Sequence, residues 1–187
     1  MNPARRFQNG ECRRAPHVKG RTPVYKHILL PTDGSALSKR AIEGGIRLAK
    51  SVGARVTAVH VTPKVAATAL EQWARGESGR RSRLAAIFDG QAKQYVAEIA
   101  AAAERAGVPC GCVRVRGESP HEEILKTAAN RGCDLIYMAS HGKRGTSALL
   151  LGSETAKVLT HSPIPVLVHR ERRRPPIASR VRLRAEY

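Results

Sequence analysis

A glycine-rich stretch in the last third of the chain carries the pattern most suited to binding an anion. It runs ASHGKRGTSALLLGS over residues 139–153, with Gly142 and Gly152 ten positions apart and Ser153 next. A helix N-terminus offers unpaired N–H groups and a partial positive charge, and glycine lets backbone approach a bound anion closely. The stretch therefore predicts either a phosphate-binding loop or a turn that ends in a helix cap.

Two well-known phosphate-binding patterns do not fit this stretch. A Walker loop needs G-x-x-x-x-G-K-[ST], whereas Lys143 and Arg144 follow Gly142 directly. The G-x-G-x-x-G dinucleotide turn is absent from the stretch as well. Ser153 could donate its hydroxyl to a phosphate or cap the helix, and the two basic residues add positive charge beside the loop.

The elements that must position this loop alternate along the chain. Five apolar runs predict strands: HILLPT (27–32), RVTAVHVT (55–62), CGCVRV (110–115), DLIYMA (134–139) and IPVLVH (164–169). The segments between them predict helices that open at 35, 84, 119 and 153. Continuous apolar strands are typical of a parallel sheet with helices on both faces, so the sequence predicts an open α/β sheet. Ligands bind such sheets beyond the carboxyl ends of the strands.

Several local signals set the expected bounds of these helices. Gly53, Gly107 and Gly132 are expected to end helices, and Ser119 with Glu122 forms a capping box at the start of another. The segment from 64 to 83 holds Trp73. Its RGESGRRSR run (75–83) predicts a solvated loop.

Charge and length bound the organisation of the molecule. The 187 residues favour one domain, and the net charge is +18. Residues 1–24 carry six Lys/Arg and one Glu, and residues 170–187 carry seven Arg and two Glu. We therefore expect a basic arm at 1–24, a domain at 25–170 and an Arg-rich tail at 171–187. No apolar run reaches a membrane span and no apolar signal core is present, so a cytoplasmic location without membrane contact is expected.

Four cysteines, Cys12, Cys110, Cys112 and Cys133, lack the spacing of a zinc site. Cys110 and Cys112 share one face of a predicted strand. Buried, reduced thiols are the expected state of these residues. The sequence predicts no metal site among them.

The sequence resembles the universal stress protein family over residues 25–170. The resemblance rests on YKHILLPTDGS, TAVHV, GESPHEEI and DLIYMASHGKRGTSALLLGSETAKVLTHSPIPVLV. The nucleotide-binding branch of that family carries G-x2-G-x9-G-[ST], and here Ala139 takes the place of the first glycine. The resemblance implies a Rossmann-like, five-stranded parallel sheet with strand order 3-2-1-4-5.

The resemblance also implies ATP, or AMP, as a ligand, with Mg²⁺ as a companion ion. Pro31 and Asp33 would line the adenine and ribose pocket, Val61 would offer backbone contacts to adenine, and Met138 and Ala139 would form the floor. The glycines, the serine and the Glu154 backbone would hold the phosphates, with the Glu154 side chain pointing outward. The implied nucleotide-binding set is Pro31, Thr32, Asp33, Val61, Met138, Ala139, His141, Gly142, Gly152, Ser153 and Glu154.

The function implied is that of an ATP-binding regulatory protein of the stress response, acting through partner proteins and a homodimer formed by the last strand, Pro165 to Val168. Hydrolysis would be slow at most, because no base or arginine finger is evident. His141 lacks a partner spaced for a catalytic triad, so no catalytic residue is predicted, and His60 and His121 are expected to pack or cap.

Two alternatives stay open. A nucleotide-free dimeric scaffold is one, because Ala139 replaces a motif glycine. A nucleic-acid-associated protein is the other, because basic arms contact phosphates non-specifically and lose affinity with salt. The absence of a helix-turn-helix or RNP motif and the 4% aromatic content argue against sequence readout.

Overall fold

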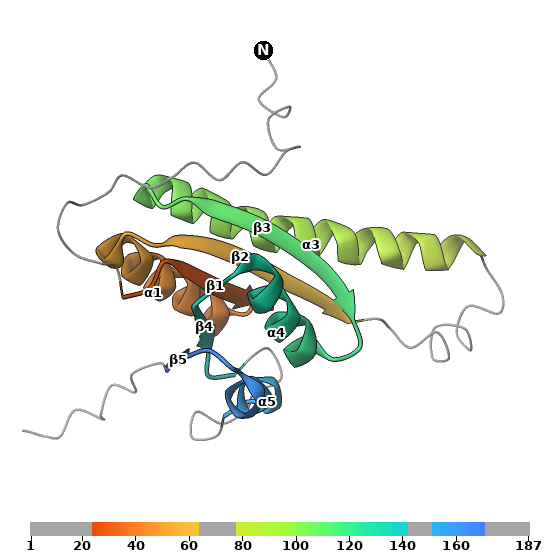
Figure 1. Cartoon of the computed structure of the whole chain (residues 1–187). Coiled ribbons are helices and arrows are strands. Elements are labelled where there is room, and N and C mark those ends of the chain that lie inside the picture. The colour runs from red at the N-terminus through yellow and green to blue at the C-terminus, as the bar shows by residue number, and fades with distance from the viewer. Residues whose placement is uncertain (1–23, 64–77, 142–150, 171–187) are drawn as a thin grey trace, which may run out of the picture.

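A five-stranded parallel sheet forms the centre of the molecule (Figure 1). The computed structural model describes residues 24–63, 78–141 and 151–170. The strands lie in the order β3-β2-β1-β4-β5. This confirms the predicted α/β sheet and its strand order. The strands are β1 (His27–Thr32), β2 (Arg55–Pro63), β3 (Cys110–Gly117), β4 (Leu135–Ala139) and β5 (Val166–His169).

Helices cover both faces of the sheet and bury two apolar clusters. Their bounds are α1 (Ala36–Val52), α3 (Ser78–Ala106), α4 (Pro120–Arg131) and α5 (Ser153–His161). On one face α1 and α3 pack on the sheet around Ile28, Leu30 and Val56. On the other face α4 and α5 pack around Leu29, Val59 and Ile136. Alternate residues of β1 thus serve opposite cores, as expected for a strand buried on both faces.

The predicted helix ends are confirmed where glycine takes the left-handed conformation. Gly53 and Gly132 have φ angles of 70° and 62° and donate their backbone N–H groups to the last turns of α1 and α4. Gly107, after α3, has a φ angle of 71°. The left-handed backbone costs glycine little, so these positions end their helices cleanly.

The loop predicted for 75–83 is wrong in its larger part, because α3 begins at Ser78. The arginines, leucine and alanines that follow are strong helix formers, and one glycine among them costs a helix only about 1 kcal/mol. Residues 75–77 and Trp73 lie outside the described residues, as do the predicted arms up to 23 and the tail from 171.

The expectation of buried thiols holds for Cys133 but is wrong for Cys112, which is exposed, while Cys110 is half-buried. The reason is the strand order, because β3 lies at an edge of the described sheet and is covered on fewer sides than a central strand. Cys12 lies outside the described residues. Within 24–63, 78–141 and 151–170, no helix has both the length and the apolar character needed to cross a membrane.

Candidate functional site

The predicted binding residues that the structure describes lie at or just after the carboxyl ends of β1, β2 and β4 and in the first turn of α5. β1 pairs with β2 on one side and with β4 on the other. The chain leaves β1 for α1 on one face and leaves β4 for α5 on the opposite face. In open α/β sheets, the crevice between two connections that diverge in this way is where ligands bind.

The turn after β1 holds a carboxylate at the rim of this crevice. Asp33 is half-buried, and its Oδ1 accepts a hydrogen bond from the Ser35 N–H at 3.0 Å. Thr32 is buried, and its Oγ1 accepts from the Gly34 N–H at 3.1 Å and bonds to Ser38 Oγ at 2.9 Å. Ser35 in turn caps α1 by accepting from the Ser38 N–H. The side chains of this turn thus fix the place of Asp33.

The Tyr95 ring of α3 packs against the same turn. Gly34 has a φ angle of 75°, and a Cβ atom there would lie 2.4 Å from the Tyr95 ring. The Tyr95 ring meets the His60 ring edge-on, with centroids 5.2 Å apart. His60 Nδ1 lies 2.7 Å from the Thr32 carbonyl oxygen, so this nitrogen carries the proton and donates. His60 therefore packs against Tyr95 and hydrogen-bonds the end of β1, in line with the prediction that it packs or caps.

The start of α5 is fastened directly to the end of β4. The Gly152 N–H donates to the Ser140 carbonyl at 2.8 Å, and Thr155 Oγ1 donates to the Ala139 carbonyl at 3.0 Å. A Cβ atom on Gly152 would lie 3.1 Å from the Cα of His141. The φ angle of Gly152 is −63°, which suits any residue, so glycine is favoured here by the close backbone approach and not by backbone conformation.

Gly152 is the N-cap of α5, so the alternative that Ser153 caps this helix is wrong. Ser153 is the first residue of the helix, and its side chain is exposed. The N–H groups of a first turn have no partner within the helix. They can therefore receive an anion at this end of the crevice. Gly142, the other glycine of the pattern, lies outside the described residues.

The Glu154 side chain, although it belongs to α5, bonds to the start of α4. Its Oε2 accepts from the His121 N–H at 2.9 Å and lies 3.1 Å from His121 Nδ1, while Oε1 lies 3.2 Å from Lys157 Nζ. The capping box predicted for α4 is wrong, because Ser119 makes no side-chain cap bond. Glu154 supplies that cap from α5, so its carboxylate is held at the start of α4.

Opposing effects act on the pKa of Glu154. Burial raises this pKa, but the His121 N–H, the Lys157 ammonium and the His121 ring lower it more in sum. The net pKa lies below the ordinary value, so the carboxylate is charged near neutral pH and offers α4 a full negative charge.

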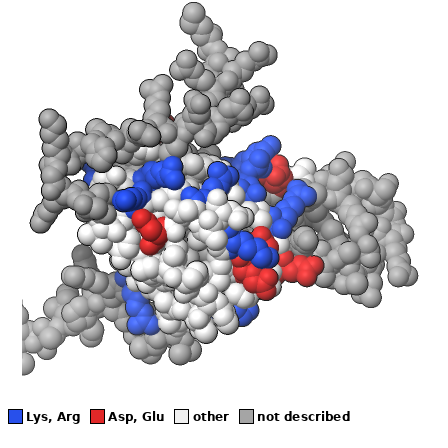
Figure 2. Space-filling model, viewed as in Figure 1, with Lys and Arg blue, Asp and Glu red and all other residues white. Residues whose placement is uncertain are grey.

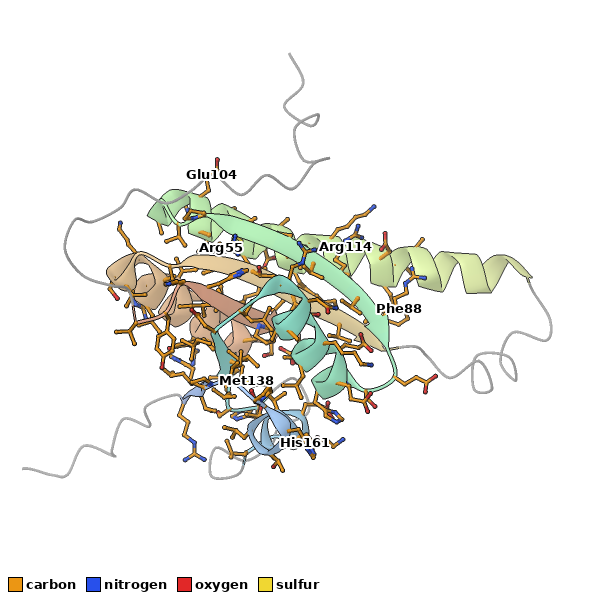
Figure 3. The ribbon with its side chains drawn as sticks, in the orientation of Figure 1. Arg55, Phe88, Glu104, Arg114, Met138 and His161 are labelled. Carbon is orange, nitrogen blue, oxygen red and sulfur yellow. The ribbon has the colours of Figure 1, made fainter. Side chains whose placement is uncertain are left out.

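The remaining predicted residues line two different sides of the sheet. Met138 is buried in the cluster under α4 and α5 (Figure 3). Val61, on β2, is partly buried against the same cluster. The methyl group of Ala139 belongs to the cluster under α1 and α3. Pro31 is half-buried at the β1 end, and His141 is half-buried with Nδ1 3.2 Å from Ser140 Oγ.

Sequence reasoning missed two residues that shape this site. Ser140 receives the Gly152 N–H, and Tyr95 packs against the β1 turn. The position of Ser140 directly after a strand could have identified it. Tyr95 comes from the middle of a long helix, and nothing in its local sequence marks the contact.

Comparisons with known proteins identify the family of this chain. The model of the universal stress protein family matches residues 24–170. Universal stress protein MJ0531 of Methanocaldococcus jannaschii is 31% identical over 148 residues, which cover 78% of this chain and 82% of that protein.

Solved structures share the fold. Hypothetical protein MJ0577 from the same archaeon has a TM-score of 0.67 at 32% identity, covering 80% of this chain and 98% of that one. The universal stress protein from Archaeoglobus fulgidus in complex with dAMP has a TM-score of 0.54 at 16% identity, covering 78% and 98% of the two chains. The second likeness concerns the fold alone. Because the family match spans most of the sequence and the relatives align over the same domain, the chain belongs to the universal stress protein family.

Proposed function

We propose that this protein binds an adenine nucleotide, ATP in the first instance, in the crevice between the β1 turn and the start of α5. The observation that carries the proposal is the close approach of Gly152 to the β4 end: a Cβ atom there would lie 3.1 Å from the His141 Cα, and the Gly152 N–H bonds to the Ser140 carbonyl, which fixes the first turn of α5 beside the end of β4. The dAMP complex of the Archaeoglobus fulgidus family member gives general support.

The residues present suit the parts of such a ligand. The Ser153 hydroxyl and the first-turn N–H groups of α5 would hold phosphate oxygens, since both donate hydrogen bonds and the helix dipole favours anions there. Asp33 would accept from ribose hydroxyls or approach a Mg²⁺ ion held by the phosphates. The Val61 backbone would contact the base.

The replacement of the first motif glycine by Ala139 is compatible with this proposal. Its methyl group packs in the cluster under α1 and α3, and the residue is 9% exposed. The methyl group therefore fills core space on that face. Nucleotide binding would act as a signal, changing how the protein meets its partner proteins in the stress response.

Titration calorimetry with MgATP and with AMP tests the proposal. Wild type should bind with a micromolar Kd, and Gly152→Val combined with Ser153→Ala should lose at least tenfold in affinity. Ser51→Ala, on the exposed end of α1, is the control and should bind as wild type does. Absence of binding to wild type would favour the nucleotide-free scaffold.

We also propose that β5 forms a homodimer by antiparallel pairing with the same strand of a second copy. Among the described strands β5 pairs only with β4, and its Leu167 side chain is 39% exposed. An apolar edge strand needs a cover, because its backbone groups are otherwise open to unwanted pairing.

Sedimentation velocity tests the dimer. Leu167→Lys should convert the dimer to a monomer. Leu159→Lys alters a residue that is 40% exposed on α5 rather than on the strand itself, and should leave the dimer intact. A dimer that survives Leu167→Lys would contradict pairing through β5.

A further inference from the structure

Two thiols lie next to each other on the edge strand opposite β5. Cys110 and Cys112 are separated by Gly111 on β3, so both side chains stand on the same face of the sheet, the face that packs against α3. Cys110 packs against the apolar cluster beneath α3, while Cys112 is exposed. One thiol is thus anchored and the other is open to solvent.

Hydrogen bonds hold both sulfur atoms in place. Cys112 Sγ lies 3.4 Å from the Val96 carbonyl of α3, and Cys110 Sγ lies 3.5 Å from the Gly111 carbonyl. The neighbouring Cys110 side chain lowers the pKa of Cys112, although burial raises it. At Cys133, by contrast, burial raises the pKa to about 12.

The surroundings of Cys112 admit a small ligand. A cavity of about 530 Å³ borders this thiol, between β3 and the turn of α3 that holds Asp89 and Ala92. Arg114 and Arg116 also line it, and Arg114 bonds to Asp89 at 2.8 Å. Arg114 extends from the middle of β3 (Figure 3), and basic side chains gather on this side of the molecule (Figure 2). Positive charge nearby stabilises thiolates.

The spacing of the two cysteines disfavours a disulfide. A strand rises about 3.3 Å per residue, which puts two Cα atoms two residues apart at about 6.6 Å, near the upper end of disulfide geometry. A metal ion between the sulfurs needs no such approach of the backbone.

The number of protein ligands available decides between Zn²⁺ and Cu(I) at this pair of cysteines. The described residues supply no third His, Cys, Asp or Glu side chain to this pair. Structural zinc sites need four ligands, so two thiolates alone serve Zn²⁺ poorly. Soft thiolates favour Cu(I), which is satisfied by two ligands.

We propose that Cys110 and Cys112 form a two-thiolate site for Cu(I) on the outer flank of β3. Two thiols release two protons and bind one Cu⁺ ion, which gives a bis-thiolate complex of charge −1 with no change in oxidation state. Arg116, which lines the same cavity, would balance that charge, since Arg114 is already paired with Asp89. The site is separate from the nucleotide crevice and does not depend on it.

Anaerobic titration of the full chain with Cu(I), in competition with a chromophoric Cu(I) chelator, tests the site. Wild type should take up one tightly held equivalent, and Cys110→Ser or Cys112→Ser should weaken it at least a hundredfold. Cys133→Ser and Cys12→Ser are matched controls and should keep wild-type affinity. The same chain should bind Zn²⁺ far more weakly.

Alkylation mapped by mass spectrometry keeps the proposal testable if a serine variant fails to fold. One equivalent of Cu(I) should protect Cys110 and Cys112 of wild type from iodoacetamide. Unprotected thiols, Cu(I) uptake that survives either serine substitution, or uptake lost in Cys133→Ser or Cys12→Ser would overturn the proposal.

Discussion

Gly34 and Gly53 both have left-handed backbone, but only Gly34 is crowded. Comparing alanine substitutions at the two positions therefore separates the free-energy cost of backbone strain from the cost of steric overlap. Gly34 and Gly53 have φ angles of 75° and 70°, but a Cβ atom at Gly34 would meet Tyr95 whereas one at Gly53 would meet nothing within 4 Å. Gly53→Ala should therefore lower the free energy of unfolding by about 1–2 kcal/mol, from backbone strain alone. Gly34→Ala should lower it by about 2–4 kcal/mol, because steric overlap adds to that strain.

Urea denaturation of both variants measures this difference. Gly34→Ala should also weaken nucleotide binding, since it displaces the turn that holds Asp33, while Gly53→Ala should leave binding unchanged. Equal costs for the two variants would mean that the Tyr95 ring moves aside without penalty.

Ala139 allows a second prediction at the scale of one methyl group. If this methyl group fills only core space, Ala139→Gly should leave MgATP affinity within about twofold of wild type. It should lower the free energy of unfolding by about 1–2 kcal/mol, from the lost methyl burial and the added backbone freedom. Calorimetry and urea denaturation on one preparation measure both. A tenfold gain in affinity would show instead that the methyl group crowds the ligand.

At the scale of elements, α5 supports α4 through one carboxylate. The Glu154 pKa lies below its ordinary value of 4.5, with burial opposing and the bonds from His121 and Lys157 prevailing. The stabilisation is therefore present above the unfolded pKa and is lost as pH falls through the folded pKa. Glu154→Gln should lower the free energy of unfolding at pH 7 by about 0.5–1 kcal/mol, toward the low end because the carboxylate is 36% exposed.

Thermal unfolding of wild type and Glu154→Gln between pH 7 and pH 3 tests the role of this carboxylate. The two Tm values should converge as the pH falls below about 4.5, the ordinary glutamate pKa. Glu118→Gln, an exposed carboxylate just before α4, serves as the control and should follow wild type throughout. A Tm difference that stays constant down to pH 3 would argue against an ionised cap.

The same cap shows what local sequence can and cannot predict. Strands such as β1 were predictable because apolar runs report burial directly, and Gly132 was predictable because the left-handed end of a helix is a local property. The Ser119 capping box failed because the acceptor comes from Glu154, which lies 33 positions along the chain from the His121 N–H that it receives. The spacing also predicted a helix that starts beside Gly152, which the structure confirms as the N-cap of α5. Only the structure shows that glycine is favoured there by the contact with His141.

At the scale of the whole molecule, the two ends of the sheet differ in function. The proposed binding crevice lies at the carboxyl ends of the strands, whereas at the opposite end hydrogen bonds around His27 link β1, β2 and β4. Asp134, just before β4, accepts from the N–H groups of Lys26 and His27 at 2.7 and 3.0 Å. His27 Nε2 lies 2.7 Å from Thr57 Oγ1 of β2. Changes here should act on global stability and leave the crevice unaltered.

His27 makes that stability depend on pH. The side chain is 6% exposed, and its Nδ1 is buried with no hydrogen-bond partner among the described residues. Burial, and then the charge of Arg55, lower the His27 pKa below 6.5, although the nearby backbone of Arg131 and then the charge of Asp134 oppose them in part. The unfolded chain therefore binds a proton that the folded chain rejects, so stability should fall as pH drops below 6.5 and level off below the folded pKa.

Urea denaturation at intervals between pH 7.5 and pH 5 measures this slope. His27→Gln keeps a donor for Thr57 but cannot titrate, so it should flatten the pH dependence while leaving MgATP affinity at pH 7.5 unchanged. His161→Gln, on the exposed end of α5, should retain the wild-type slope. A group contributes to the pH dependence of stability only if its pKa differs between the folded and unfolded chain. An unchanged slope in His27→Gln would therefore mean that the His27 pKa is the same in both states.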